Sequence, residues 1–127
     1  MHKFLSLEWM KAYKDLWNSK EDLIKELDGF NASIKYKIEG KDPGVSLSVE
    51  KGVAKEVEEA TKDKYDFEMW ADLDIWKRLA TGDLGPKAAL LTKKLKFKGS
   101  MITAMKYMSA FEKSITMMGE IPAVFEL

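Results

Sequence analysis

The clearest structural signal in the chain is YDFEMWADLDIWKRLATG, residues 65–82, in which the spacing of the apolar residues changes halfway. Before Asp72, apolar residues alternate with polar ones, which is the pattern of a strand with one buried face. After Asp72, they recur every three or four residues until Gly82, which is the pattern of an amphipathic helix. Asp72 is a favourable N-cap for this helix, and Gly82 is a favourable terminator. We therefore expect a strand that leads directly into a helix.

The same two patterns continue toward the N-terminus. Residues 7–29 carry apolar side chains at helical spacing, and Asn18-Ser19 divides them into two predicted helices, with Ser19 as the cap of the second. Alternating apolar residues then predict three strands, over residues 32–39, 45–50 and 53–58. The third is the least distinct of them, because glutamate and alanine suit a helix as well.

Toward the C-terminus, Pro86 opens a short predicted helix over residues 86–92, and a strand follows over residues 95–98. Ser100 then caps a long helix that we expect to reach about Met118. We therefore predict one α+β domain over residues 1–127, in which helices pack on one face of a mainly antiparallel sheet of about five strands.

The composition excludes many kinds of catalytic site. The chain has 21 basic and 21 acidic residues, no cysteine, and a single histidine, His2. The absence of cysteine excludes disulfides, thiolate zinc sites and cysteine nucleophiles, and no motif of a serine nucleophile, a zinc protease or a phosphate-binding loop is present. Glu56, Glu58 and Glu59 lie among lysines, which is typical of a solvated edge. We expect no catalytic residue, no metal and no cofactor, and the zero net charge argues against a nucleic-acid partner.

No part of the chain predicts a targeting or membrane segment. The N-terminus lacks the apolar run of a signal peptide, and no stretch approaches the roughly 18 apolar residues of a transmembrane helix. We therefore expect a cytoplasmic protein.

Methionines are concentrated near the C-terminus, where five of the eight lie between Met101 and Met118. With their neighbours they give the last predicted helix a broad apolar face, formed by Met101, Ile102, Ala104, Met105, Met108, Phe111, Ile115 and Met118. This face could simply pack against the sheet, with methionine as filler. It could instead line a cavity, because unbranched methionine side chains adapt to different apolar ligands.

Two tryptophans also bear on whether these residues form a core or a ligand site. Trp70 falls on the polar face of its predicted strand, beside Glu68. It either turns back into the core at a bulge, or it lies at the mouth of a pocket or on a partner surface. Trp76, on the following helix, is more simply explained as a core residue.

A basic stretch lies between these elements and contains no acidic residue from Leu84 to Gly99. Its lysines are Lys87, Lys93, Lys94, Lys96 and Lys98. The simplest interpretation is a solvated face. The functional alternative is a site for an anionic lipid head group, a membrane surface or the phosphates of a coenzyme A thioester. The stretch has too few aromatic residues to predict an RNA-binding surface.

Residues 65–109 resemble the sterol carrier protein type-2 (sterol-transfer) domain family. The resemblance is carried, in the family's order and spacing, by FEMWAD (67–72), WKRLATG (76–82), PKAALL (86–91) and KLKFKGSM (94–101). It implies an antiparallel sheet and helices that enclose an apolar tunnel, and non-covalent binding of lipids such as sterols, fatty acids, acyl thioesters or phospholipids. Two positions depart from the family pattern: Lys93 stands where a glycine is usual, and Ser100 where an aspartate or asparagine is common.

Under this resemblance, the helix over residues 101–118 would close the tunnel, and Trp76, Leu79 and Ala80 would flank it. We predict that lipid is bound by Trp70, Trp76, Leu79, Met101, Met105, Met108, Phe111, Ile115 and Met118. The predicted partner is a lipid or fatty-acyl molecule, with transient contact to a membrane. Two alternatives stay open: a protein-interaction module that forms a homodimer through the same helix face, and an accessory domain that presents a lipid-like substrate to an enzyme.

Overall fold

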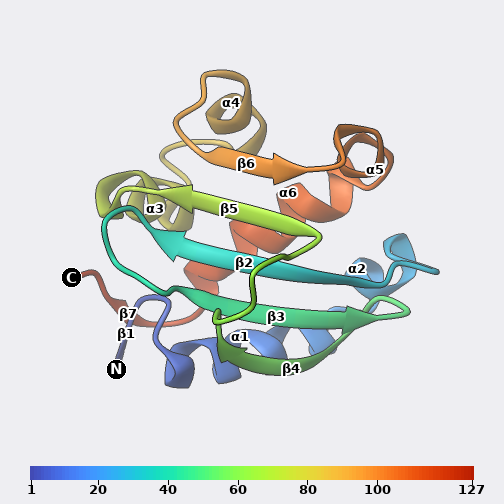
Figure 1. Ribbon diagram of the computed structural model, residues 1–127, viewed down its shortest axis with the longest axis horizontal. Helices are drawn as coiled ribbons and strands as arrows, with labels where there is room; N and C mark the ends of the chain where they lie inside the picture. The colour runs from blue at the N-terminus through green and yellow to red at the C-terminus, as the bar shows by residue number, and fades with distance from the viewer.

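The computed structural model describes residues 1–127 and is built on a five-stranded sheet in the order β4-β3-β2-β5-β6 (Figure 1). The strands are β2 (Ala32–Ile38), β3 (Val45–Glu50), β4 (Val53–Glu59), β5 (Phe67–Ala71) and β6 (Lys96–Gly99). Strands β2 and β5 are parallel, and the other three pairs are antiparallel. The mainly antiparallel sheet is therefore confirmed, and so is its least distinct strand, β4.

Two local features explain why β4 is a strand. Lys51 and Gly52, which join it to β3, both have positive φ angles, of 49° and 80°, as a two-residue hairpin turn requires. In addition, the side chain of Asn18 accepts a hydrogen bond from the Ala54 N–H at 2.9 Å and donates one to the Ala54 carbonyl at 2.8 Å. These bonds tie the edge strand to the first long helix, α1 (Leu7–Ser19).

Helices cover one face of the sheet, and the other face is left open (Figure 1). Besides α1, the helices are α2 (Glu21–Glu26), α3 (Leu73–Thr81), α4 (Pro86–Leu91), α5 (Met101–Lys106), α6 (Met108–Thr116) and the 3-10 helix η1 (Met117–Glu120). Two short parallel strands, β1 (His2–Lys3) and β7 (Ala123–Val124), join the two ends of the chain. The predicted one-sided packing of helices is thus observed.

The core between the sheet and the helices is rich in aromatic side chains. Trp9, Tyr13 and Trp17 of α1, Tyr36 of β2 and Trp76 of α3 are all fully buried. Their rings stack or meet edge to edge, with Trp9 and Tyr13 at 5.3 Å and Tyr13 and Tyr36 at 6.0 Å between centroids. The space between the two layers is therefore filled largely by indole and phenol rings.

The long C-terminal helix expected from Ser100 to Met118 is wrong, because the chain breaks it at Tyr107. There φ is −109° and ψ is 23°, which separates α5 from α6. The Tyr107 ring packs edge-on against Phe30, with centroids 5.0 Å apart, while Phe111 and Ile115 of α6 are buried in the core. No glycine or proline marks this break, so it reflects tertiary packing rather than local sequence.

The expected cap of the second helix is also wrong. The N-cap of α2 is Lys20, whose side chain makes no capping hydrogen bond. The Ser19 hydroxyl instead donates to the Leu16 carbonyl at 2.6 Å, which satisfies one of the free carbonyls at the end of α1.

Candidate functional site

An apolar pocket of about 410 Å³ lies at the β6 edge of the sheet, where α4, α5 and α6 approach this strand. It is lined by Trp70, Leu90, Lys93, Leu95, Lys96, Phe97, Met101, Ala104 and Met108. Seven of these nine residues are hydrophobic, and two are lysines. Its volume falls within the range of about 300–1,000 Å³ that is typical of small-molecule sites. We call it the β6-edge pocket.

The strand register places both faces of the sheet edge in this pocket. Trp70 is paired with Lys37 on one side and with Lys96 on the other, so it lies on the open face of the sheet. Phe97 is paired with Met69 and points to the opposite, helix-covered face. The pocket therefore wraps around the edge strand, with an indole and a lysine on one side and apolar side chains on the other.

The regular register excludes one of the two interpretations of Trp70. No register shift interrupts the pairing of β5 with β2 or β6, so the bulge that would return Trp70 to the core is absent. Trp70 is partly exposed at the pocket, whereas Trp9, Trp17 and Trp76 are fully buried. Trp70 is thus the one indole that a ligand in this pocket could contact.

Three of the nine residues predicted to bind lipid line this pocket: Trp70, Met101 and Met108. Met105 lies one turn beyond Met101 on α5 and is exposed. The other five, Trp76, Leu79, Phe111, Ile115 and Met118, are buried in the core. The structure therefore brings the predicted set together only in part.

The core position of Trp76 has a clear physical basis. Its indole Nε1–H donates to the Lys37 carbonyl at 3.0 Å, and its side chain is fully buried. The core interpretation of Trp76 is thus confirmed. Its ring lies near those of Tyr36 and Phe4, at 6.5 and 5.6 Å between centroids. The enclosed apolar tunnel that the resemblance implies stays a prediction.

The sequence reasoning missed three apolar lining residues, Leu90, Leu95 and Phe97. A fourth, Ala104, was placed on the apolar helix face but not in the predicted lipid-binding set. Phe97 alternates with Lys96 and Lys98 in β6, which is a signal for a half-buried strand residue. That signal predicts burial but not the wall of a pocket, because an edge strand meets α4 and α5 only through the tertiary fold.

The predicted basic stretch divides into two groups. Lys96 and Lys98 form ion pairs with Glu39 at 2.8 Å and Glu68 at 3.9 Å. The other three, Lys87, Lys93 and Lys94, form no ion pair. Uncompensated positive charge therefore lies on the α4 side of the pocket.

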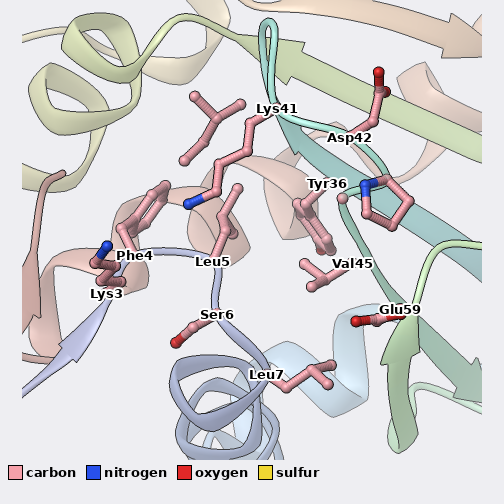
Figure 2. Close-up of a pocket in the computed structure, with 13 residues that line it drawn as sticks. Lys3, Phe4, Leu5, Ser6, Leu7, Tyr36, Lys41, Asp42, Val45 and Glu59 are labelled. Carbon is pink, nitrogen blue, oxygen red and sulfur yellow. The ribbon is translucent and has the colours of Figure 1, made fainter. Parts of the chain in front are cut away.

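A second cavity, of about 280 Å³, lies on the opposite side of the molecule and is bordered by the N-terminal segment and the β2–β3 loop (Figure 2). Its apolar wall includes Phe4, Leu5 and Val45. Figure 2 shows the Lys41 side chain extending over this wall toward Phe4. No residue of the predicted lipid-binding set lines it.

The four groups whose pKa departs clearly from its ordinary value all lie outside the β6-edge pocket. Burial raises the pKa of Tyr13 and Tyr36 above the ordinary value, and both tyrosines lie in the core. A hydrogen bond from Lys37 lowers the pKa of Asp42, and one from Lys113 lowers the pKa of Glu26. No group of three or more His, Cys, Asp or Glu side chains is placed to hold a metal ion. None of the helices combines the length and apolar character that crossing a bilayer would require.

Comparison with known proteins gives a consistent result. The model of the SCP-2 sterol transfer family matches residues 10–112. A crystal structure of sterol carrier protein 2 superposes with a TM-score of 0.82 at 21% identity, over 94% of this chain and all of that chain. A possible sterol carrier protein from Thermus thermophilus superposes with a TM-score of 0.75 at 21% identity, over 98% and 93% of the two chains. A search of curated proteins by sequence finds no match.

The same fold also occurs inside a larger enzyme. The sec-alkylsulfatase Pisa1 from a Pseudomonas species superposes with a TM-score of 0.57 at 15% identity. The match covers 77% of this chain but only 15% of the sulfatase. These structural likenesses, all below 25% identity, establish the shared fold.

Proposed function

The chain belongs to the SCP-2 sterol transfer family, and on this premise we propose that it binds lipid non-covalently in the β6-edge pocket and transfers it without chemical change. The observation that carries the proposal is the combination of size and lining. A cavity of about 410 Å³ is lined by seven hydrophobic residues, Trp70 among them, and by two lysines. This is the arrangement expected for an apolar chain with a polar end.

The hydrophobic effect is large enough to drive such binding. A chain that buries about ten methylene groups gains about 8 kcal/mol, at about 0.8 kcal/mol for each group. Association costs at least about 4 kcal/mol in lost translational and rotational freedom. A useful net affinity remains without any directed polar contact.

The lining also defines the class of ligand. Met101 and Met108 are unbranched and can repack around chains of different shape, so we expect broad selectivity for the apolar part. Lys93 has no ion-pair partner and borders the same pocket, so an anionic head group is favoured. Fatty acids, acyl-coenzyme A and phospholipids meet both conditions, and a sterol-like molecule meets only the first.

Tryptophan fluorescence tests the proposal directly, because Trp70 is the one partly exposed tryptophan. Titration with a fatty acid should change the emission of the wild type, and Trp70→Phe should abolish most of this change. Native mass spectrometry should show bound lipid in both proteins. A protein that carries no lipid and whose emission is unchanged on titration would contradict the proposal.

Two methionines on α5 provide a matched pair of variants. Met101 lines the pocket, and Met105 lies one turn away outside it. Both are exposed, so neither change should unfold the protein. Met101→Glu should weaken binding of the fatty acid at least tenfold through desolvation and charge repulsion, and Met105→Glu should leave it nearly unchanged. Equal effects of both changes would place the site elsewhere.

The second candidate function is an interaction module, and the exposed apolar face of α5 favours it. In that case Met105 would bury against a second copy or another protein. An accessory role beside an enzyme is supported by the sulfatase, in which this fold forms a small part of a larger chain. Sedimentation of the purified protein separates these candidates, because a ligand-free dimer that Met105→Glu dissociates would favour the interaction module.

A further inference from the structure

One surface of the molecule exposes an unusual amount of apolar side chain. Six large hydrophobic side chains are strongly exposed, and two of them, Met1 and Leu127, are the chain ends. The other four lie on α4 and α5: Leu91 (75% exposed), Met101 (59%), Ile102 (86%) and Met105 (70%). Apolar side chains gathered in this way mark an interaction surface.

Three of these side chains lie on α5 and one on α4, and we call the four together the α4–α5 surface. On α5, Met101 and Met105 are one turn apart and Ile102 lies between them, so the three are neighbours on the helix. Leu90, which precedes Leu91 on α4, lines the same pocket as Met101. Both helices flank β6 at the same edge of the sheet (Figure 1).

The chain segment that includes α4, β6 and α5 carries only positive charge. From residue 84 to residue 111 the chain has six lysines and no acidic residue. Lys96 pairs with Glu39, just after β2, and Lys98 pairs with Glu68 of β5. The remaining four, Lys87, Lys93, Lys94 and Lys106, form no ion pair. A chain of zero net charge thus carries a local excess of positive charge beside its exposed apolar side chains.

Lys93 adds an independent observation. Its φ angle is +59°, in the left-handed region that is unfavourable for any residue with a Cβ atom. A lysine therefore occupies a strained position at the border of the pocket, although glycine would fit the backbone better.

We infer that the α4–α5 surface docks on an anionic lipid bilayer. Leu91, Ile102 and Met105 enter the interfacial region, and the four unpaired lysines contact lipid phosphates. This inference rests on the proposed function, because docking places the border of the β6-edge pocket at the membrane from which a lipid enters. A bilayer is favoured over a second copy of the chain, because a two-fold contact would bring the lysines of the two copies together.

Vesicle flotation tests the inference with the full-length protein. The wild type should bind vesicles of phosphatidylcholine with phosphatidylglycerol, and should bind pure phosphatidylcholine vesicles much less. Each lysine near an anionic surface raises affinity about fivefold, so Lys93→Glu with Lys94→Glu should weaken binding at least about 25-fold at low salt. The apolar variant, Ile102→Gln with Met105→Gln, should also weaken binding, and this loss should persist at high salt.

The chain offers a matched control for the charge reversal. Lys51 and Lys55 are exposed, form no ion pair and lie at β4, the opposite edge of the sheet from β6. Lys51→Glu with Lys55→Glu should bind vesicles like the wild type. If this control loses as much affinity as the Lys93 and Lys94 variant, the attraction is general and the docking surface is refuted.

The absence of cysteine allows a site-specific readout. A polarity-sensitive fluorophore attached through Ile102→Cys should shift to the blue on anionic vesicles, whereas one attached through Glu56→Cys on β4 should not. Equal shifts at both sites would overturn the inference.

Fatty-acid titration without vesicles separates failure of this inference from failure of the proposed function. A protein that binds fatty acid in solution but no vesicles would refute docking and leave the carrier function standing. Dissociation of a dimer by the Ile102 and Met105 changes, without vesicle binding by the wild type, would instead assign the surface to a second copy.

Discussion

Removal of the hydroxyl group from Tyr13 and from Tyr36 should have opposite consequences, although both tyrosines are fully buried. The Tyr13 hydroxyl donates to the Ser114 carbonyl at 2.8 Å. The Tyr36 hydroxyl has no hydrogen-bond partner in the protein. A buried polar group without a partner is costly. Tyr13→Phe therefore removes a favourable hydrogen bond, whereas Tyr36→Phe removes a buried hydroxyl that has no partner.

The magnitudes follow from these contacts. Tyr13→Phe leaves the buried Ser114 carbonyl without this donor and should lower the free energy of unfolding by about 1–3 kcal/mol. For a chain of this size the melting temperature should fall by roughly 4–12 °C. Tyr36→Phe should be neutral or slightly stabilising at pH 7.

The pH dependence provides a second readout. Burial raises the pKa of both hydroxyls in the folded state, so the unfolded chain ionises first as the pH rises above about 10. Their contribution to stability is therefore complete below that pH and is lost above it. Each tyrosine should lower the free energy of unfolding by about 1.4 kcal/mol per pH unit, and each single variant should reduce the slope by that amount.

Urea unfolding at pH 7 and across the alkaline range, with tyrosinate absorbance as an independent signal, measures both quantities. All other groups are common to the wild type and the variants, so differences between the proteins isolate the two hydroxyls. The reasoning is refuted if Tyr36→Phe destabilises as much as Tyr13→Phe, or if neither variant changes the alkaline slope.

Three further predictions concern other parts of the fold. Gly119→Ala should lower the free energy of unfolding by about 3 kcal/mol or more in chemical denaturation, because the added Cβ would overlap the carbonyl oxygen of Ala80 and backbone atoms cannot rotate away. Lys93→Gly should raise the free energy of unfolding by up to about 1 kcal/mol, and with it the melting temperature, because glycine relieves the left-handed strain. The same change should weaken vesicle binding. Glu26→Gln should flatten the acid side of the stability profile: the Lys113 hydrogen bond lowers the pKa of Glu26, so its contribution is present above the ordinary pKa and is lost as the pH falls.

Each of these changes has a control and a contrary outcome. Gly85 has open space around its Cα and no positive φ, but it is the N-cap of α4, where glycine is preferred to alanine, so Gly85→Ala should cost at most about 1 kcal/mol. A loss equal to that of Gly119→Ala would contradict the packing argument. A destabilised Lys93→Gly variant would show that left-handed strain is not significant there. An acid profile unchanged by Glu26→Gln would show that the ion pair contributes nothing to stability.

Much of the fold could be predicted from spacing alone. The change of period at Asp72 correctly separates β5 from α3, and the Asp72 side chain accepts a hydrogen bond from the Ile75 N–H at 2.8 Å, as the cap prediction requires. Gly82 ends α3 with a φ of 81°. These features are local, because a cap or a turn depends on residues within four positions of each other.

The candidate site was predicted less completely. Trp70, Met101 and Met108 line the pocket. Phe111 and Ile115 belong to the core, although the spacing places them on the same helix face as Met101 and Met108. The break at Tyr107 does not by itself separate these groups, because Met108, Phe111 and Ile115 all lie on α6. Met108, in the first turn of α6, lines the pocket, whereas Phe111 and Ile115 pack into the core. Periodicity cannot reveal such a break when no glycine or proline is present.

Residue spacing was enough to predict the α+β class and the order of the five sheet strands and most helices along the chain, but not the terminal strands β1 and β7. The tertiary structure decided which strands are neighbours, where the last helix breaks, and which lysines are left without an acidic partner. The physical reason is the range of the interactions. Hydrophobic period, caps and turns act within one or two turns of chain, whereas Lys96 meets Glu39, and Trp70 lines one pocket with Met108, only because elements far apart in the sequence pack together.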